Sequence, residues 1–160
     1  MATQQQYEYF KFKYKEEDDR NALLTKRAEI YLSIVSLVFT GLIFKISDIK
    51  TYCDKNTAFL IIFCLLLGSL IVSIWFILQA IKLRDYQEDM DVGTYTNELG
   101  QTQPTDSDFF DNRIARFIVA IPQNFKINND KAEQLKSAGR FLFLSFILLS
   151  IFIIAIATFN

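Results

Sequence analysis

The sequence predicts an all-α membrane protein with three transmembrane helices, and three observations carry this prediction. The stretch from Ala58 to Ile81 contains no charged residue. At about 1.5 Å of rise per residue, a helix of this length crosses a hydrocarbon core of about 30 Å. Two further apolar runs flank it, and the charged residues lie before the first run and between the runs. The expected spans are about residues 29–46, 58–82 and 140–159.

The N-terminal segment, residues 1–28, is predicted to be a cytosolic arm followed by a helix. From Phe10 onward, aromatic residues alternate with lysines. This period of two fits either a short edge strand or a flexible aromatic-basic arm on the membrane surface. The four acidic residues 16–19 suit the positive end of a helix dipole. We therefore expect the helix to begin there and to continue into the first span.

The first span carries small polar residues on one face. Ser33, Ser36 and Thr40 fall at i, i+3 and i+7, beside Gly41. Such a face lets helices approach closely and hydrogen-bond, and it can also line a hydrated path. A loop at 47–57 is expected to return the chain into the second span, whose small residues could meet this face. The small residues of the second span are Cys64, Gly68, Ser69 and Ser73.

The region 83–139 is predicted to hold a cytosolic loop and helices. Residues 91–108 are rich in Thr, Asn, Gln and Gly, the composition of a loop, and 92–96 within them form an alternative strand that could pair with the N-terminal arm. Apolar residues then recur at i, i+3, i+4 and i+7, which predicts a short amphipathic helix at about 109–121. Pro122 is expected to end or kink it.

The final helix is expected to begin at a new cap. Asp130 and Glu133 have the spacing of a capping box. A water-facing segment follows them, and the third span then runs to the end of the sequence. Gly139, at the entry to this span, could allow a bend. The whole chain, 1–160, is expected to form one membrane domain.

The Lys and Arg residues predict the topology. Six precede the first apolar run, three lie between the first and second runs, and eight lie between the second and third, which accounts for all 17. Because cytoplasmic segments carry the excess of Lys and Arg, we expect the N-terminus and the long region in the cytoplasm. The C-terminus would then lie outside.

The composition argues against several classes of function. The chain has no histidine, the commonest general base and metal ligand, and two cysteines are too few for a metal cage or a disulfide framework. It has no glycine-rich phosphate loop, and the apolar runs 30–44, 58–81 and 141–159 contain no Asp, Glu or Arg that would suggest proton-coupled transport. A net charge of −1 gives no argument for nucleic-acid binding. We predict no enzyme activity, no cofactor and no metal site.

Two segments resemble small bacterial membrane effectors of antiphage defence, the SLATT-type and Pycsar transmembrane effectors. The first is TKRAEIYLSIVSLVFTGLIF, residues 25–44, and the second is IPQNFKINNDKAEQLKSAGRFLFL, residues 121–144. The resemblance implies a homo-oligomer in the bacterial inner membrane that responds to an infection signal, often a cyclic nucleotide made by a partner enzyme, and then disrupts the membrane. The candidate ligand-binding residues are the cations Arg113, Arg116, Lys126 and Lys131.

Two functions of different classes follow. In the first, the protein is a signal-gated, oligomeric inner-membrane effector, and a seam of serines opens or the bilayer is perturbed. In the second, it is a non-enzymatic anchor or sensor subunit, and its Tyr7–Lys15 arm and cytosolic helices hold a soluble partner at the membrane. A neighbouring gene for a nucleotide cyclase or another signal generator would favour the first, and one for a soluble enzyme or nuclease the second.

Overall fold

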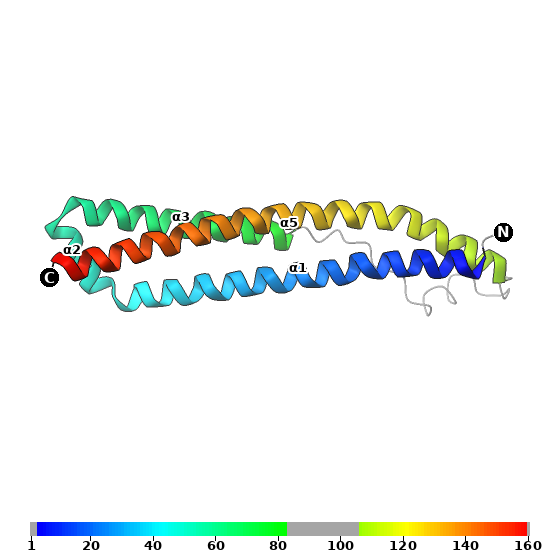
Figure 1. Cartoon of the computed structure of the whole chain (residues 1–160), viewed down its shortest axis with the longest axis horizontal. Coiled ribbons are helices and arrows are strands. Elements are labelled where there is room, and N and C mark those ends of the chain that lie inside the picture. The colour runs from blue at the N-terminus through cyan, green and yellow to red at the C-terminus, as the bar shows by residue number, and fades with distance from the viewer. Residues whose placement is uncertain (1–2, 83–105, 160) are drawn as a thin grey trace. The chain divides into compact units, whose positions relative to one another are not determined.

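The computed structural model describes residues 3–82 and 106–159, and nearly all of them are helical (Figure 1). This confirms the all-α prediction for the described part of the chain. Three helices are long and apolar enough to cross a membrane, which identifies a membrane protein. The alternative strand at 92–96 and most of the loop predicted at 91–108 lie outside the described residues. The helices are α1 (Gln4–Phe44), α2 (Ile46–Lys55), α3 (Thr57–Lys82) and α5 (Asp106–Phe159).

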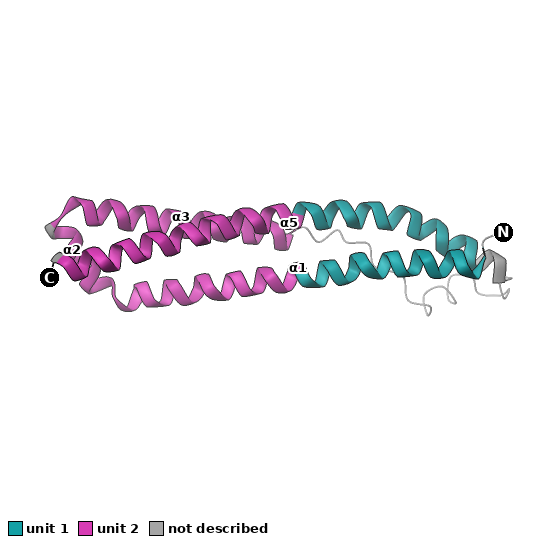
Figure 2. Cartoon of the chain, viewed as in Figure 1, with its two compact units in different colours: residues 1–23, 83–130 teal, residues 24–82, 131–160 magenta. Residues whose placement is uncertain are grey.

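The chain divides into two compact units (Figure 2). Unit 1 comprises residues 1–23 and 83–130, and unit 2 comprises residues 24–82 and 131–160. The helices α1 and α5 each contribute one part to each unit. Unit 1 is thus a helix pair, and unit 2 is a bundle that contains the apolar spans.

Helix α1 begins at Gln4, so the predictions of an edge strand or flexible arm and of a helix start at residues 16–19 are wrong. The hydroxyl of Thr3 accepts a hydrogen bond from the Gln6 backbone N–H at 3.3 Å, and the Gln6 side-chain oxygen accepts one from the Thr3 N–H at 3.0 Å. This reciprocal pair is a capping box, which satisfies two backbone donors at the helix start. The aromatic-basic segment is therefore helical.

The core of unit 1 follows a seven-residue repeat rather than a period of two. Residues 7, 10, 14, 17 and 21 of α1 are partly buried, and their spacing alternates between three and four. The ring of Tyr7 lies 5.3 Å from that of Phe110 and 6.1 Å from that of Phe117, and Tyr14 lies 5.4 Å from Phe117. Phe117 is 2% exposed, and burying a side chain of its size contributes about 1.5–3 kcal/mol.

Helix α5 is a single helix of 54 residues, which corrects two predictions. The expected helix at 109–121 does not end at Pro122, and Asp130 does not cap a new helix. Proline removes one backbone donor and normally breaks the hydrogen bond to the carbonyl four residues earlier. Pro122 and Ile118 are both exposed, so water can hydrate that carbonyl and the helix continues.

Unit 2 packs the apolar parts of α1, α3 and α5 around one core. Its largest fully buried side chains are Leu66, Leu70, Ile77, Val35 and Ser73. Helices α1 and α5 run in the same direction, while α3 runs against both, as expected for a chain that enters, returns and crosses again (Figure 1). The three predicted spans are thus present as one bundle.

A short helix, α2, occupies the connection that was expected to be a loop. Its Ile49 is 5% exposed, and the ring of Tyr52 packs 6.0 Å from that of Phe59 on α3. Helix α2 ends at Lys55, and the side-chain oxygen of the next residue, Asn56, accepts a hydrogen bond from the Ala58 N–H at 2.9 Å and so caps α3. The turn is therefore an ordered part of unit 2.

Candidate functional site

Two serines of α3 bind α5 inside unit 2. The Ser69 and Ser145 hydroxyl oxygens lie 2.7 Å apart, and the Ser73 hydroxyl donates to the Ala138 carbonyl at 3.0 Å. Ser69 is 6% exposed and Ser73 is fully buried. Hydrogen bonds of this kind contribute about 0.6 kcal/mol each inside a membrane. Both residues are helix-packing residues, and their partners are on the third span rather than the first.

The small polar residues of the first span lie on the outside of unit 2. Ser33, Ser36 and Thr40 are exposed, and each hydroxyl donates to the carbonyl four residues earlier in its own helix, at 2.8–2.9 Å. Gly41 is also exposed, and a Cβ added there would meet nothing within 4 Å. We call the face formed by Ser33, Ser36 and Thr40 the α1 polar stripe, while Gly41 lines a groove described below.

The predicted seam therefore does not form within one chain. Its α3 members Ser69 and Ser73 point to α5, while the α1 polar stripe points away from the bundle. Gly68 is exposed as well, with open space around its Cα. Within the described residues nothing covers the α1 polar stripe, so burying it would require another molecule.

Helices α1 and α5 approach each other closely at Tyr31 and Gly139. The sequence did not predict this contact. A Cβ added to Gly139 would lie 3.1 Å from the Tyr31 hydroxyl oxygen and 3.5 Å from the Tyr31 Cζ. Helix α5 runs through Gly139 without a break. The glycine therefore makes room for the tyrosine, and a sequence signal for this is the run of small residues Ser137, Ala138 and Gly139.

The four candidate ligand-binding cations are not brought together. Arg113 is 4% exposed and Lys131 is 7% exposed, and both side chains have partners in the structure. Arg116 and Lys126 are exposed. Arg113 and Lys131 are separated by 18 positions of one helix, which corresponds to about 27 Å at 1.5 Å per residue. One small ligand cannot contact both residues.

Unit 1 contains instead a polar layer between its two helices. The Asn128 side-chain amide donates to the Glu17 carbonyl at 2.8 Å and to its carboxylate at 2.7 Å. Arg20 donates to the Asn129 side chain at 2.6 Å and lies over the Phe125 ring, 5.5 Å from its centre. Asn128 is fully buried. Buried amides at core positions of paired helices fix the register at a cost in stability.

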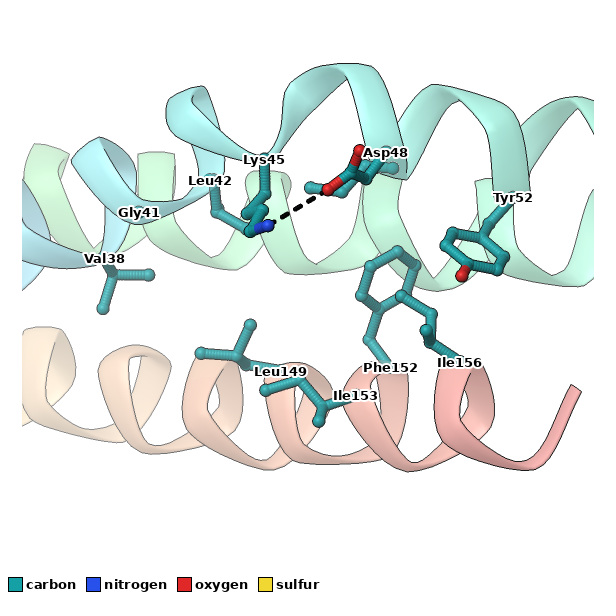
Figure 3. A pocket seen from close by; sticks show the side chains of 11 residues that line it. Val38, Gly41, Leu42, Lys45, Asp48, Tyr52, Leu149, Phe152, Ile153 and Ile156 are labelled. Atoms are coloured by element: carbon teal, nitrogen blue, oxygen red, sulfur yellow. Dashed lines mark hydrogen bonds and ion pairs between the residues drawn. The ribbon is translucent and has the colours of Figure 1, made fainter. Parts of the chain in front are cut away.

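A groove opens at the end of unit 2 where α1 gives way to α2 (Figure 3). It has a volume of about 460 Å³. Apolar side chains from the end of α1, from α2 and from the last turns of α5 line it, and Lys45 and Asp48 form an ion pair of 3.1 Å at its edge (Figure 3). The other lining residues are Val38, Gly41, Leu42, Ile49, Tyr52, Leu149, Phe152, Ile153 and Ile156.

Cys53 lies on α2, where it is partly buried against the core of unit 2. Burial, followed by the nearby Asp54 carboxylate, raises its pKa above the usual range. Because the thiolate is the reactive form, the thiol is less nucleophilic near neutral pH than a free cysteine. Its reaction with thiol reagents should therefore accelerate as the pH rises.

Searches with the chain find no matching family model, curated protein or solved structure.

Proposed function

We propose that the protein is a signal-gated, oligomeric effector that disrupts the integrity of the bacterial inner membrane in antiphage defence. One observation carries this proposal. The α1 polar stripe lies on the outer surface of an apolar span, where a single copy presents it to lipid. The resemblance of residues 25–44 and 121–144 to membrane effectors of antiphage defence points the same way.

The chemistry of the stripe suits assembly between copies. Its hydroxyls are satisfied by their own helix, so one copy can insert alone without unpaired polar groups. Small side chains allow a second helix to approach closely, and hydroxyls can then exchange bonds across the contact. Several copies with their stripes turned inward would enclose a path less apolar than lipid. A signal that changes the packing of unit 1 would gate this path.

The charge distribution supports an orientation with the N-terminus in the cytoplasm. Unit 1 holds the charged part of α1 and the first part of α5. Cytoplasmic segments are those enriched in Lys and Arg. In this orientation unit 1 meets a soluble cytosolic signal generator or its product.

A matched pair of substitutions tests the proposal. Ser36 on α1 and Ser150 on α5 are both exposed, and both donate to the carbonyl four residues earlier at 2.8 Å. Ser36→Leu should abolish the depolarisation that accompanies activation in cells carrying the native gene cluster, at normal protein abundance. Ser150→Leu should leave it intact. Full depolarisation with Ser36→Leu would sink the proposal.

A second candidate function, a non-enzymatic anchor or sensor subunit, is favoured by exposed apolar residues in unit 1. Tyr9 and Phe12 are 59% and 63% exposed, and Ile118 and Val119 are each 53% exposed. Contiguous apolar patches on a protein surface are common contact sites for other proteins. If the anchor reading holds, Tyr9→Ser with Phe12→Ser should abolish activity of the complete gene cluster, while Ser36→Leu should have no effect.

A further inference from the structure

The groove at the α1–α2 turn combines an apolar interior with a charged edge. Val38 and Leu42 on one side face Leu149 and Ile153 of α5 on the other (Figure 3). Lys45 and Asp48 are paired at 3.1 Å, and their side chains remain 72% and 63% exposed. The pair therefore has open sides that can contact another molecule.

The position of the groove along the span fixes its surroundings. Lys45 is the first charged residue after the apolar run of 30–44, and Asp48 follows one turn later. Charged side chains at the end of a span lie in the headgroup region, while the apolar residues before them lie in hydrocarbon. The groove thus runs from the hydrocarbon region to the headgroups at one face of the membrane.

The groove has a volume of about 460 Å³ and a mainly apolar lining. A helix with side chains is about 10–12 Å wide. A flexible hydrocarbon chain is much thinner and can follow the whole length of the groove. A lipid acyl chain is therefore the better fit.

The charged edge selects the headgroup. The Lys45 ammonium can donate to a lipid phosphate, and the Asp48 carboxylate can accept from a lipid ammonium. An anionic glycerol headgroup would match Lys45 but would meet the like charge of Asp48. We propose that the groove is a binding site for one phospholipid with an amine headgroup, of the phosphatidylethanolamine type, whose acyl chain lies along Leu42, Leu149 and Phe152. This inference does not depend on the effector function.

Photocrosslinking of the full-length protein tests the site. The protein is placed in vesicles of phosphatidylethanolamine and phosphatidylglycerol, with a trace of phosphatidylethanolamine that carries a diazirine on one acyl chain. Adducts are then mapped by peptide mass spectrometry. We expect them to concentrate in residues 38–52 and 149–156. Adducts spread evenly over exposed residues of all spans, such as Leu65 and Ile71, would show only annular lipid and overturn the site.

Filling the groove provides the matched comparison. Gly41 lines the groove, and an added Cβ meets nothing within 4 Å. Gly41→Leu should lower the groove adducts at least about fivefold, because the leucine takes the place of the acyl chain. Gly68→Leu is the control, since Gly68 is an equally unobstructed glycine that lies outside the groove. Ile153→Phe fills the groove from the α5 side. This variant provides a second test of the site if Gly41→Leu alters assembly.

The headgroup assignment has its own experiment. The same diazirine chain on phosphatidylglycerol should give fewer groove adducts than on phosphatidylethanolamine. Lys45→Gln combined with Asp48→Asn should remove that difference. Equal yields from the two lipids in the unsubstituted protein would overturn the headgroup preference. Groove adducts that persist undiminished in both Gly41→Leu and Ile153→Phe would overturn the acyl-chain site itself.

Discussion

The contact between Gly139 and Tyr31 should make these two residues energetically coupled. An alanine at position 139 would place its Cβ 3.1 Å from the tyrosine hydroxyl oxygen and 3.5 Å from Cζ. Optimal separations between carbon atoms are about 3.5–4.0 Å, so only the hydroxyl is too close. Tyr31→Phe removes that atom and leaves an ordinary contact.

Two opposing effects set the magnitude for Gly139→Ala. Alanine favours the helix over glycine by about 0.8–1.0 kcal/mol. Overpacking of a close contact costs about 1–3 kcal/mol. We expect Gly139→Ala to be neutral or destabilising in the natural chain and to stabilise the Tyr31→Phe variant by about 0.5–1 kcal/mol. The coupling energy between the two substitutions should therefore be about 1 kcal/mol.

Unfolding in mixed detergent micelles measures this coupling. Trp75 is the only tryptophan, so its fluorescence and the helical circular dichroism report the transition. Gly68→Ala is the control, because its Cβ would meet nothing within 4 Å and should show no coupling to Tyr31. Additivity of Gly139→Ala and Tyr31→Phe within about 0.3 kcal/mol would refute the reasoning.

Three further predictions address packing, electrostatics and topology. Ser73→Leu forces a large side chain into a fully buried contact and should lower protein abundance through a loss of about 1–3 kcal/mol; normal abundance would contradict the α3–α5 contact. Asn128→Asp places a second carboxylate beside Glu17. Repulsion between the two negative charges then raises the pKa of one of the two carboxyl groups in the folded state. Because the folded state then binds its proton more tightly than the unfolded state, unfolding experiments should show stability recovering as the pH falls below about 5, and an unchanged pH profile would argue against this contact. Cys53 should react with a membrane-impermeant maleimide on intact cells, faster at pH 8.5 than at pH 7, whereas Asp18→Cys should react only after permeabilisation; labelling of position 18 in intact cells would reverse the topology.

The apolar spans were predictable because membrane insertion leaves a strong and local signal. No charged residue occurs between Ala58 and Ile81, and only a helix can satisfy its backbone in hydrocarbon. The helical start at Gln4 was also readable from the Thr3–Gln6 capping box and from the three-four spacing that begins at Tyr7. The alternation of aromatics and lysines covers only residues 10–15. This stretch is too short to distinguish a strand from a helix.

Other features depend on packing that short patterns do not reveal. Pro122 usually ends a helix, and its tolerance depends on its exposed position. The direction of Ser69 and Ser73 toward α5 depends on which span lies on which side of α3, and their small size alone could not decide this. The groove brings the end of α1 and the neighbouring α2 together with the last turns of α5, which is far away in the sequence. Its individual residues carry no motif.

The central claim is that copies of the protein meet through the α1 polar stripe, and cysteine crosslinking in native membranes tests it most directly. Cys53 and Cys64 are replaced by alanine, and one new cysteine is placed at Ser36 or at Ser150. A membrane-permeant oxidant and short bismaleimide linkers then join copies whose new cysteines are close. We predict covalent dimers for Ser36→Cys and none for Ser150→Cys, at equal abundance. Crosslinking of Ser150→Cys alone, or no crosslinking at Ser36→Cys in active cells, would contradict the account.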